Sequence, residues 1–240
     1  MSRDGPVLVI GGTRGTGLLI ARLLMQQGFP VRALARSQAD AARRAPDLTD
    51  IVEGDITQPT TLPPAVAEAR HIIFTAGRRS GHASSERQIR LVEFDGVQNT
   101  LAAATESGFD GRFLYMTASG GGRPSFWSLA LNLYKGNTLE WRTRAEMAIR
   151  ASGLAYTIIR AGMLTNAPGG RHGIRVTQRA LPLSPFHRIP RADVASVFVA
   201  AMQHPRTART TFDIVQQRGA EPWLGCLDRL EPDPPSPAAR

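Results

Sequence analysis

The sequence has very little cysteine and few aromatic residues. Cys226 is the single cysteine among 240 residues, which excludes an internal disulfide and a zinc centre built on several cysteines. A reduced, cytoplasmic setting is therefore the expectation. No apolar run approaches the ~20 residues that a membrane helix needs. The first apolar run, 7–10, stops at Gly11, so we predict neither a signal peptide nor a membrane partner.

Lysine is almost absent. Lys135 is the only one, so the formal net charge of +9 comes almost entirely from arginine. The arginines are scattered rather than collected in one stripe, and dispersed charge is usually a solvated surface. We therefore do not expect nucleic acid as the partner. A basic nucleic-acid-binding protein stays an alternative, which salt-sensitive binding of DNA would reveal.

Patterns for metal binding and for hydrolysis are also missing. The five histidines form no H-x-x-x-H pair, and no cluster of carboxylates accompanies them, so no metal is expected. No G-x-S-x-G motif points to a hydrolase. The expected partner is a small-molecule substrate, and the sequence leaves open whether the protein is a monomer or a dimer.

Short β-rich runs alternate with longer helical patterns along the chain. Strands are predicted at 6–11, 30–35, 51–53, 71–75, 112–117, 155–160 and 211–215, and helices at 15–27, 63–69, 84–107, 137–152 and 190–203. This alternation predicts an α/β fold with a doubly wound, Rossmann-type parallel sheet in three αβα layers. We expect one domain over 1–219, which includes a small C-terminal substrate region. Residues 220–240 end in a proline-rich stretch with little apolar content, so we expect a flexible tail there.

A glycine-rich loop follows the first predicted strand, in "VLVIGGTRGTGLLIARLL" (7–24). Gly11 permits a tight turn, Gly15 lets the backbone approach a diphosphate, and Gly17 lets the helix pack closely on the strand. The N-terminus of the following helix offers unpaired N–H groups to phosphates. A glycine-rich turn that only packs strand on helix is the alternative. The candidate cofactor residues here are Gly11, Gly12, Thr13, Arg14, Gly15, Thr16 and Gly17.

The end of the second strand indicates which nucleotide would bind. NAD-selective sites carry an acid about 20 residues after the loop, where it bonds the ribose 2′-hydroxyl. This chain has Arg36 at that place, and a guanidinium suits a 2′-phosphate. Arg14 and the hydroxyl of Ser37 can reach the same phosphate. The sequence therefore favours NADP (NADPH) over NAD, with a solvated strand-end role for Arg36 as the alternative.

Later motifs resemble the short-chain dehydrogenase/reductase superfamily. They are "GDIT" (54–57), "FTAG" (74–77), "VEFDGVQNTLAAATESG" (92–108), "RFLYMTAS" (112–119), "RAEMAIRASGLAYTIIRAGMLTN" (144–166) and "IPRADVASVFVAAMQHP" (189–205). The last two are similar to an atypical NAD(P)H-binding branch that includes biliverdin/flavin reductase-like and NmrA-like proteins. The resemblance implies that Asp55 and Ile56 lie near the adenine. It also implies that Thr75, Ala76 and Gly77 border the cofactor.

Two departures from that superfamily are visible. Ala161 stands where this branch usually has proline, and the Y-x-x-x-K pair of the larger branch is missing, with Thr138 and Arg142 at those places. Tyr134 is a possible replacement proton donor, although its neighbour Lys135 does not share its helix face. Thr117 and Ser119, at the end of the fifth strand, are the other catalytic candidates. Capping of a turn is the alternative for both.

These observations lead to one expected function and one alternative. We expect an NADP(H)-dependent oxidoreductase that transfers hydride to a conjugated, flavin- or quinone-like acceptor, because no protein acid is evident. Residues 120–125 would form a mobile substrate loop, and Phe126 and Trp127 an apolar wall. The alternative is a non-catalytic NADP(H)-binding redox sensor or an assembly or regulatory protein.

Overall fold

The computed structural model describes residues 5–77, 85–121, 123, 125–134, 136–219 and 222–235. Within this part of the chain, eight strands form one sheet in the order β3-β2-β1-β4-β5-β6-β10-β8, parallel except for β8. The strands are β1 (Val7–Ile10), β2 (Val31–Ala35), β3 (Asp50–Glu53), β4 (His71–Phe74), β5 (Arg112–Ala118), β6 (Ala155–Ala161), β8 (Gly173–Thr177) and β10 (Thr210–Gln217). Two short strands, β7 (Met163–Thr165) and β9 (Arg188–Pro190), pair separately.

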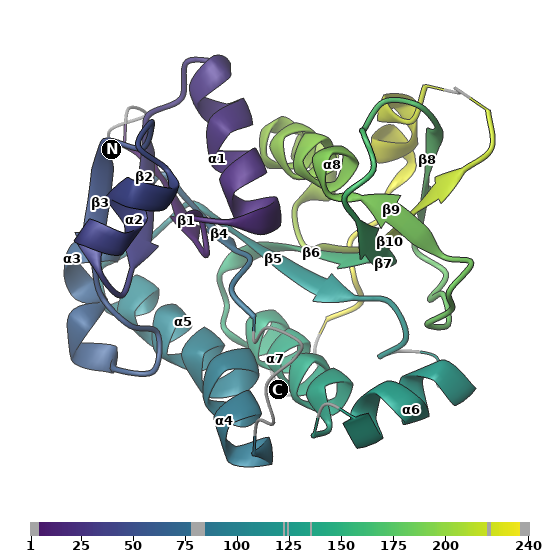
Figure 1. The fold of residues 1–240 in the computed structure, drawn as a ribbon, viewed down its shortest axis with the longest axis horizontal. Helices are drawn as coiled ribbons and strands as arrows, with labels where there is room; N and C mark the ends of the chain where they lie inside the picture. Colours follow the sequence, from purple (N-terminus) through teal and green to yellow (C-terminus); the bar gives the residue numbers. More distant parts are fainter. Residues whose placement is uncertain are drawn as a thin grey trace.

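Helices cover both faces of the sheet (Figure 1). They are α1 (Gly15–Gln26), α2 (Gln38–Arg44), α3 (Pro63–Val66), α4 (Glu86–Arg90), α5 (Gly96–Glu106), α6 (Phe126–Tyr134), α7 (Thr138–Ala151) and α8 (Arg191–Gln203). Helices α1 and α8 lie on one face, and α3, α5 and α7 lie on the other. The predicted doubly wound, three-layer fold is therefore confirmed.

The central strand β1 shows why the sequence forms this sheet. All four of its side chains are buried, as expected for a parallel strand covered on both faces. Val7 and Val9 pack in the core cluster under α1 and α8. Leu8 and Ile10 pack in the opposite cluster with residues of α3 and α5. Alternation of side chains along the strand thus supplies both halves of the core.

The predicted strands and helices are all present, with different boundaries. The helix predicted over 63–69 stops at Val66, because Glu68 has a positive φ of 58° that an α-helix does not accept. The helix predicted over 84–107 is α4, a π-helical turn at Leu91–Asp95 and α5. Helices α2 and α6 and strands β7, β8 and β9 were not predicted, because their segments are short or lack clear periodicity.

Part of the expected tail is packed against the sheet. Within 222–235, a 3₁₀ segment at Leu224–Arg229 buries Leu227, and Leu230 is buried after it. The carboxylate of Asp233 accepts hydrogen bonds from the backbone N–H of Thr211 and from the hydroxyl of Tyr156, each at 3.0 Å. A few well-placed contacts order this stretch, although its composition predicted none. Residues 220, 221 and 236–240 lie outside the described part.

The first residue of β4 is a histidine held in its neutral form. The Nδ1 atom of His71 accepts the backbone N–H of Arg112 at 3.1 Å. Burial, with added repulsion from Arg70 and Arg112, lowers the pKa of His71 to about 4. In the unfolded chain the imidazole binds a proton near its ordinary pKa of 6.5. Its contribution to stability is therefore complete above pH 6.5 and is lost as the pH falls from 6.5 to 4.

Replacement of His71 by glutamine should flatten this pH dependence. The amide oxygen of His71→Gln can still accept the N–H of Arg112, but it does not titrate. Between pH 7 and pH 4, the free energy of unfolding of the wild type should fall by about 3 kcal/mol more than that of the variant. Urea unfolding at the two pH values measures this, since all other groups titrate in both proteins. If the free energy of unfolding fell equally in the two proteins, the neutral state assigned to His71 would be contradicted.

Candidate functional site

The glycine loop brings the first turn of α1 very close to the ends of two strands. Gly11 has a φ of +86°, a conformation that favours glycine. A Cβ atom on Gly17 would lie 2.3 Å from the carbonyl oxygen of Gly11 and 2.5 Å from Oγ1 of Thr75. Thr75 in turn donates this hydroxyl to the carbonyl of Ile10 at 2.9 Å. The first turn of α1 is therefore seated directly on the ends of β1 and β4.

The N-terminus of α1 is suited to an anion. Arg14 precedes the helix without a side-chain cap, and the first turn carries no acidic residue. Thr16 is buried, and its Oγ1 has no hydrogen-bond partner among the described residues. Helix N–H groups and a buried hydroxyl without a partner are what a diphosphate would satisfy. The residues present therefore fit the phosphates of a dinucleotide.

The end of β4 lies beside this loop. A Cβ atom on Gly11 would be 2.9 Å from the backbone nitrogen of Ala76. On the far side, a Cβ atom on Gly77 would be 2.9 Å from Nη2 of Arg142. The three residues Thr75, Ala76 and Gly77 thus run from the glycine loop to helix α7. This is the path along which the resemblance places the cofactor.

On the expected adenine side of the site lies an acidic residue, Glu53. The spacing from the glycine loop, which identified Arg36, does not reveal it. Arg36 is exposed directly after β2, and Ser37 caps α2 by accepting the N–H of Asp40 at 3.2 Å. Its hydroxyl proton remains able to donate. Glu53, at the end of β3 beside Ala35, accepts the N–H of Gln38 at 3.1 Å. The strand order, rather than distance along the chain, brings this carboxylate to the neighbourhood of Arg36.

Asp55 and Ile56 are held by local contacts. One carboxylate oxygen of Asp55 accepts the backbone N–H and the hydroxyl of Thr57, each at 2.9 Å. Ile56 is buried, and its side chain packs so closely on Gly96 of α5 that a Cβ there would meet it at 2.8 Å. Ile56 therefore belongs to the core against α5, while Asp55 stabilises the turn after β3.

The place of the family lysine is occupied by a buried ion pair. Arg142 of α7 makes a two-pronged contact with Glu93, with Nε–Oε2 at 2.8 Å and Nη2–Oε1 at 3.1 Å. The π-helical turn at Leu91–Asp95 carries Glu93, which is only 2% exposed. Burial opposes the charged form of Arg142, but Glu93, together with Tyr115 and Glu146, outweighs this effect and raises the pKa of Arg142. This guanidinium cannot relay a proton near neutral pH.

Thr117 and Ser119 are both buried at the carboxyl end of β5. The Oγ1 atom of Thr117 makes no hydrogen bond of ordinary length in the described part of the chain, although it lies close enough to the hydroxyl of Tyr115 to oppose the rise that burial causes in the pKa of that phenol. The backbone N–H of Ser119 donates to the carbonyl of Ala161 at 3.0 Å. Strand register puts Thr117 in one row with Arg160 of β6 and Asp213 of β10. Burial raises the pKa of Asp213 to about 6, against the opposing effects of Ser119 and Arg160.

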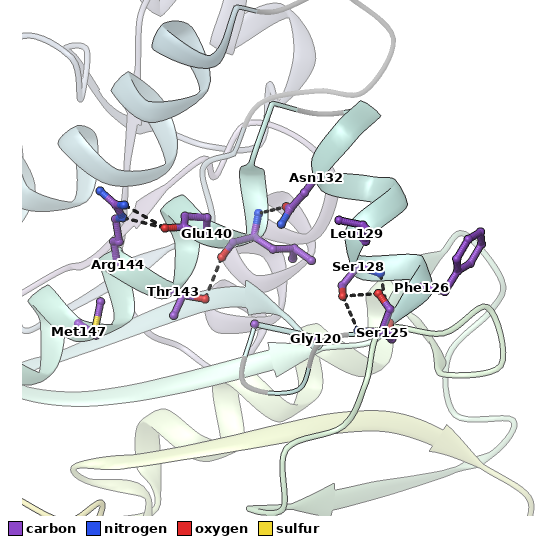
Figure 2. A pocket seen from close by; sticks show the side chains of 12 residues that line it. Gly120, Ser125, Phe126, Ser128, Leu129, Asn132, Glu140, Thr143, Arg144 and Met147 are labelled. Carbon is purple, nitrogen blue, oxygen red and sulfur yellow. Dashed lines mark hydrogen bonds and ion pairs between the residues drawn. The ribbon is translucent and has the colours of Figure 1, made fainter.

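A groove of about 980 Å³ lies between α6 and α7, next to Gly120 and Gly121 (Figure 2). Its other lining residues are Ser125, Phe126, Ser128, Leu129, Asn132, Leu139, Glu140, Thr143, Arg144 and Met147. Phe126 lines the groove as expected, whereas Trp127 packs edge-on against Phe126 at 5.7 Å between ring centroids. Tyr134 is strongly exposed at the end of α6. Gly122 and Pro124, in the predicted substrate loop, lie outside the described residues.

The described residues contain neither a metal-binding cluster nor a membrane-spanning helix. No group of three or more His, Cys, Asp or Glu side chains there is placed to hold a metal ion. No helix in the same ranges is long and apolar enough to cross a membrane.

Comparison with known proteins settles the family. A family model described as NAD(P)H-binding matches residues 11–205. The chain belongs to this NAD(P)H-binding family, in the atypical short-chain dehydrogenase/reductase group. The resemblance expected from the later motifs is confirmed, and the protein binds NAD(P)H. The glycine loop, the end of β4 and the α1 N-terminus described above lie inside the matched range.

The similar proteins differ in what their names say they do. Sanguinarine reductase of Eschscholzia californica is 29% identical, over 89% of each chain. The photosystem II assembly factor Ycf39 of Synechocystis is 26% identical, over 93% of this chain and 67% of its own length.

Solved structures show the same fold. A putative NAD-dependent epimerase/dehydratase from Bacillus halodurans has a TM-score of 0.79 at 22% identity, covering 94% of this chain and 100% of its own. ChuY, an anaerobilin reductase from Escherichia coli O157:H7, has a TM-score of 0.71 at 22% identity, covering 90% of this chain and 99% of its own.

The Glu93–Arg142 pair was not found from the sequence. The sequence identified one member of the pair, because Arg142 stands at the lysine position of the Y-x-x-x-K motif. Its partner lies 49 residues earlier in the chain, and only the packing of α7 against the π-helical turn brings them together.

Removal of the charge on Glu93 should be strongly destabilising. Glu93→Gln leaves the largely buried Arg142 guanidinium without the carboxylate that bonds it directly, which should cost about 3–5 kcal/mol of unfolding free energy. The matched control is Glu140→Gln on α7, whose partner Arg144 is about half exposed. That change should cost less than about 1 kcal/mol. Equal losses for the two variants in urea unfolding would contradict a buried, dehydrated pair.

Proposed function

We propose that this protein is an NADPH-dependent reductase that delivers hydride to a conjugated small-molecule acceptor of the flavin or quinone type. The observation that carries the proposal is the ion pair that holds Arg142. With its guanidinium paired to Glu93 and a threonine at position 138, helix α7 offers no tyrosine–lysine acid. An acceptor that delocalises the incoming electron pair does not need such an acid, and water can supply the proton.

The chain's own residues would bind and orient the cofactor. The α1 N-terminus and Thr16 would hold the diphosphate, Arg36 and Ser37 a 2′-phosphate, and Thr75 to Gly77 the central part of the dinucleotide. The Oγ1 of Thr117, which makes no hydrogen bond of ordinary length among the described residues, is the hydroxyl we assign to the nicotinamide amide or to a substrate carbonyl. Bound NADPH supplies the hydride, and the protein contributes proximity and orientation.

The names of two similar proteins support a reductase. One is a sanguinarine reductase and the other an anaerobilin reductase. A second candidate function rests on Ycf39, which is named as an assembly factor and matches most of this chain. In that case the protein would bind NADP(H) as a sensor or assembly factor without transferring hydride.

Charge reversal at Arg36 tests the choice of nucleotide. Arg36→Glu should weaken NADPH binding at least tenfold, because a carboxylate repels the 2′-phosphate, while NADH binding should change less than threefold. The matched control is Arg175→Glu, on the exposed edge strand β8 at the opposite end of the sheet. It should change neither affinity. Fluorescence titration with both nucleotides measures the effect, and equal weakening of NADPH and NADH would rule out the phosphate contact.

Turnover separates the two candidate functions. Purified protein with NADPH should reduce at least one member of a panel of quinones, FMN and riboflavin faster than the protein-free background. Thr117→Val should lower the rate while leaving NADPH affinity within about threefold, because the methyl group preserves volume but cannot donate a hydrogen bond. Absorbance at 340 nm follows the reaction. No oxidation above background across the panel, together with unequal binding of NADP⁺ and NADPH, would favour the sensor.

A further inference from the structure

Helix α6 turns its polar side chains towards the protein and most of its apolar side chains towards solvent, the opposite of an ordinary surface helix. Its two polar side chains, Ser128 and Asn132, are one turn apart and point towards the rest of the protein (Figure 2). Ser128 donates to the carbonyl of Ser125 at 2.7 Å, and the Asn132 Oδ1 accepts the backbone N–H of Leu139 at 2.9 Å. The inward face is therefore held by hydrogen bonds, whereas surface helices usually turn their apolar stripe inward.

The outward face of α6 is apolar. Phe126, Leu129 and Leu133 follow a helical spacing of three and four residues, and Trp127 and Tyr134 are seven residues apart, so these side chains share one broad face. Two of them, Phe126 and Leu129, also line the groove between α6 and α7. All five are between 50% and 80% exposed. Figure 1 shows α6 at one corner of the molecule, beside α7 and away from the centre of the sheet. A contiguous apolar surface of this kind marks an interaction site.

Next to this face arginines outnumber carboxylates, since Glu140 across the groove is paired with Arg144. Helix α6 itself carries no charged residue, and the exposed Arg123 precedes it. The loop before β9 reaches the start of α6, where the Ser125 hydroxyl donates to the carbonyl of Leu183 at 2.9 Å. This loop continues into Phe186, which is strongly exposed, and the exposed Arg188. The whole chain adds a net charge of +9.

We propose that the outward face of α6 binds the surface of an anionic lipid bilayer. Aromatic and aliphatic side chains would enter the headgroup region, where tryptophan and tyrosine rings are favoured. The arginines and the net charge would be attracted to anionic headgroups. A second copy of this chain fits the surface less well, because two molecules of charge +9 repel each other. The binding is peripheral, since α6 has nine residues and cannot span a bilayer.

Flotation with lipid vesicles tests this proposal on the full chain. The wild type should bind vesicles of phosphatidylcholine with phosphatidylglycerol at least tenfold more than vesicles of phosphatidylcholine alone, and less at high salt. Leu133→Asp should reduce the bound fraction at least tenfold. The matched control is Leu224→Asp, which makes the same change at an exposed leucine in the Leu224–Arg229 segment and should bind like the wild type. Thermal unfolding of both variants verifies that they are folded.

The fluorescence of Trp127 gives a second readout. Anionic vesicles should shift the emission of the wild type to shorter wavelength, and the shift should be lost in Trp127→Phe although Trp141 and Trp223 remain. Three results would overturn the proposal: no binding to anionic vesicles, equal binding to both vesicle types, or equal loss in Leu133→Asp and Leu224→Asp. A dimer in light scattering that Leu133→Asp converts to a monomer, without vesicle binding, would assign the face to a second copy instead.

Discussion

The close packing of α1 on the ends of β1 and β4 organises the nucleotide side of the molecule. Gly17 has no room for a side chain, because the carbonyl of Gly11 and the hydroxyl of Thr75 occupy the space a Cβ would need. This approach aims the first turn of α1 at the carboxyl edge of the sheet. It also brings the end of β4 next to the N-terminus of α1. The close packing at Gly17 therefore positions both the helix N-terminus and the strand end along which the dinucleotide is expected to lie.

Helix α7 shows how a catalytic position can become a structural one. Arg142 pairs with Glu93, and four residues further on Glu146 bonds to Arg160 of β6 with Nε–Oε1 at 3.0 Å. Both glutamates are almost completely buried, whereas the arginines keep a small part of their surface in water, so each buried carboxylate depends on its pairing. These contacts tie α7 to the π-helical turn and to β6. The same side chains that hold the helix in place leave it without a proton-relay pair.

The order of the main elements could be read from the sequence because it depends on local patterns. The apolar run 7–10 with its glycine loop, and the regular spacing in 92–108 and 190–203, are independent of distant contacts. Helix α6 escaped prediction because it has only nine residues and is apolar almost all round, so its sequence shows no clear helical periodicity. Residues 222–235 were misjudged because average composition does not reveal that Leu227, Leu230 and Asp233 meet matching partners.

The sequence by itself determined the α/β class, the glycine loop, the family and the absence of a tyrosine–lysine pair. Each of these rests on residue types at short spacing. Only the tertiary structure decided that Arg142 forms an ion pair with Glu93, that Glu53 lies beside the end of β2, and that α6 presents its apolar face outward. The physical reason is that partners of buried charges, and the direction a helix faces, depend on which distant segments pack together.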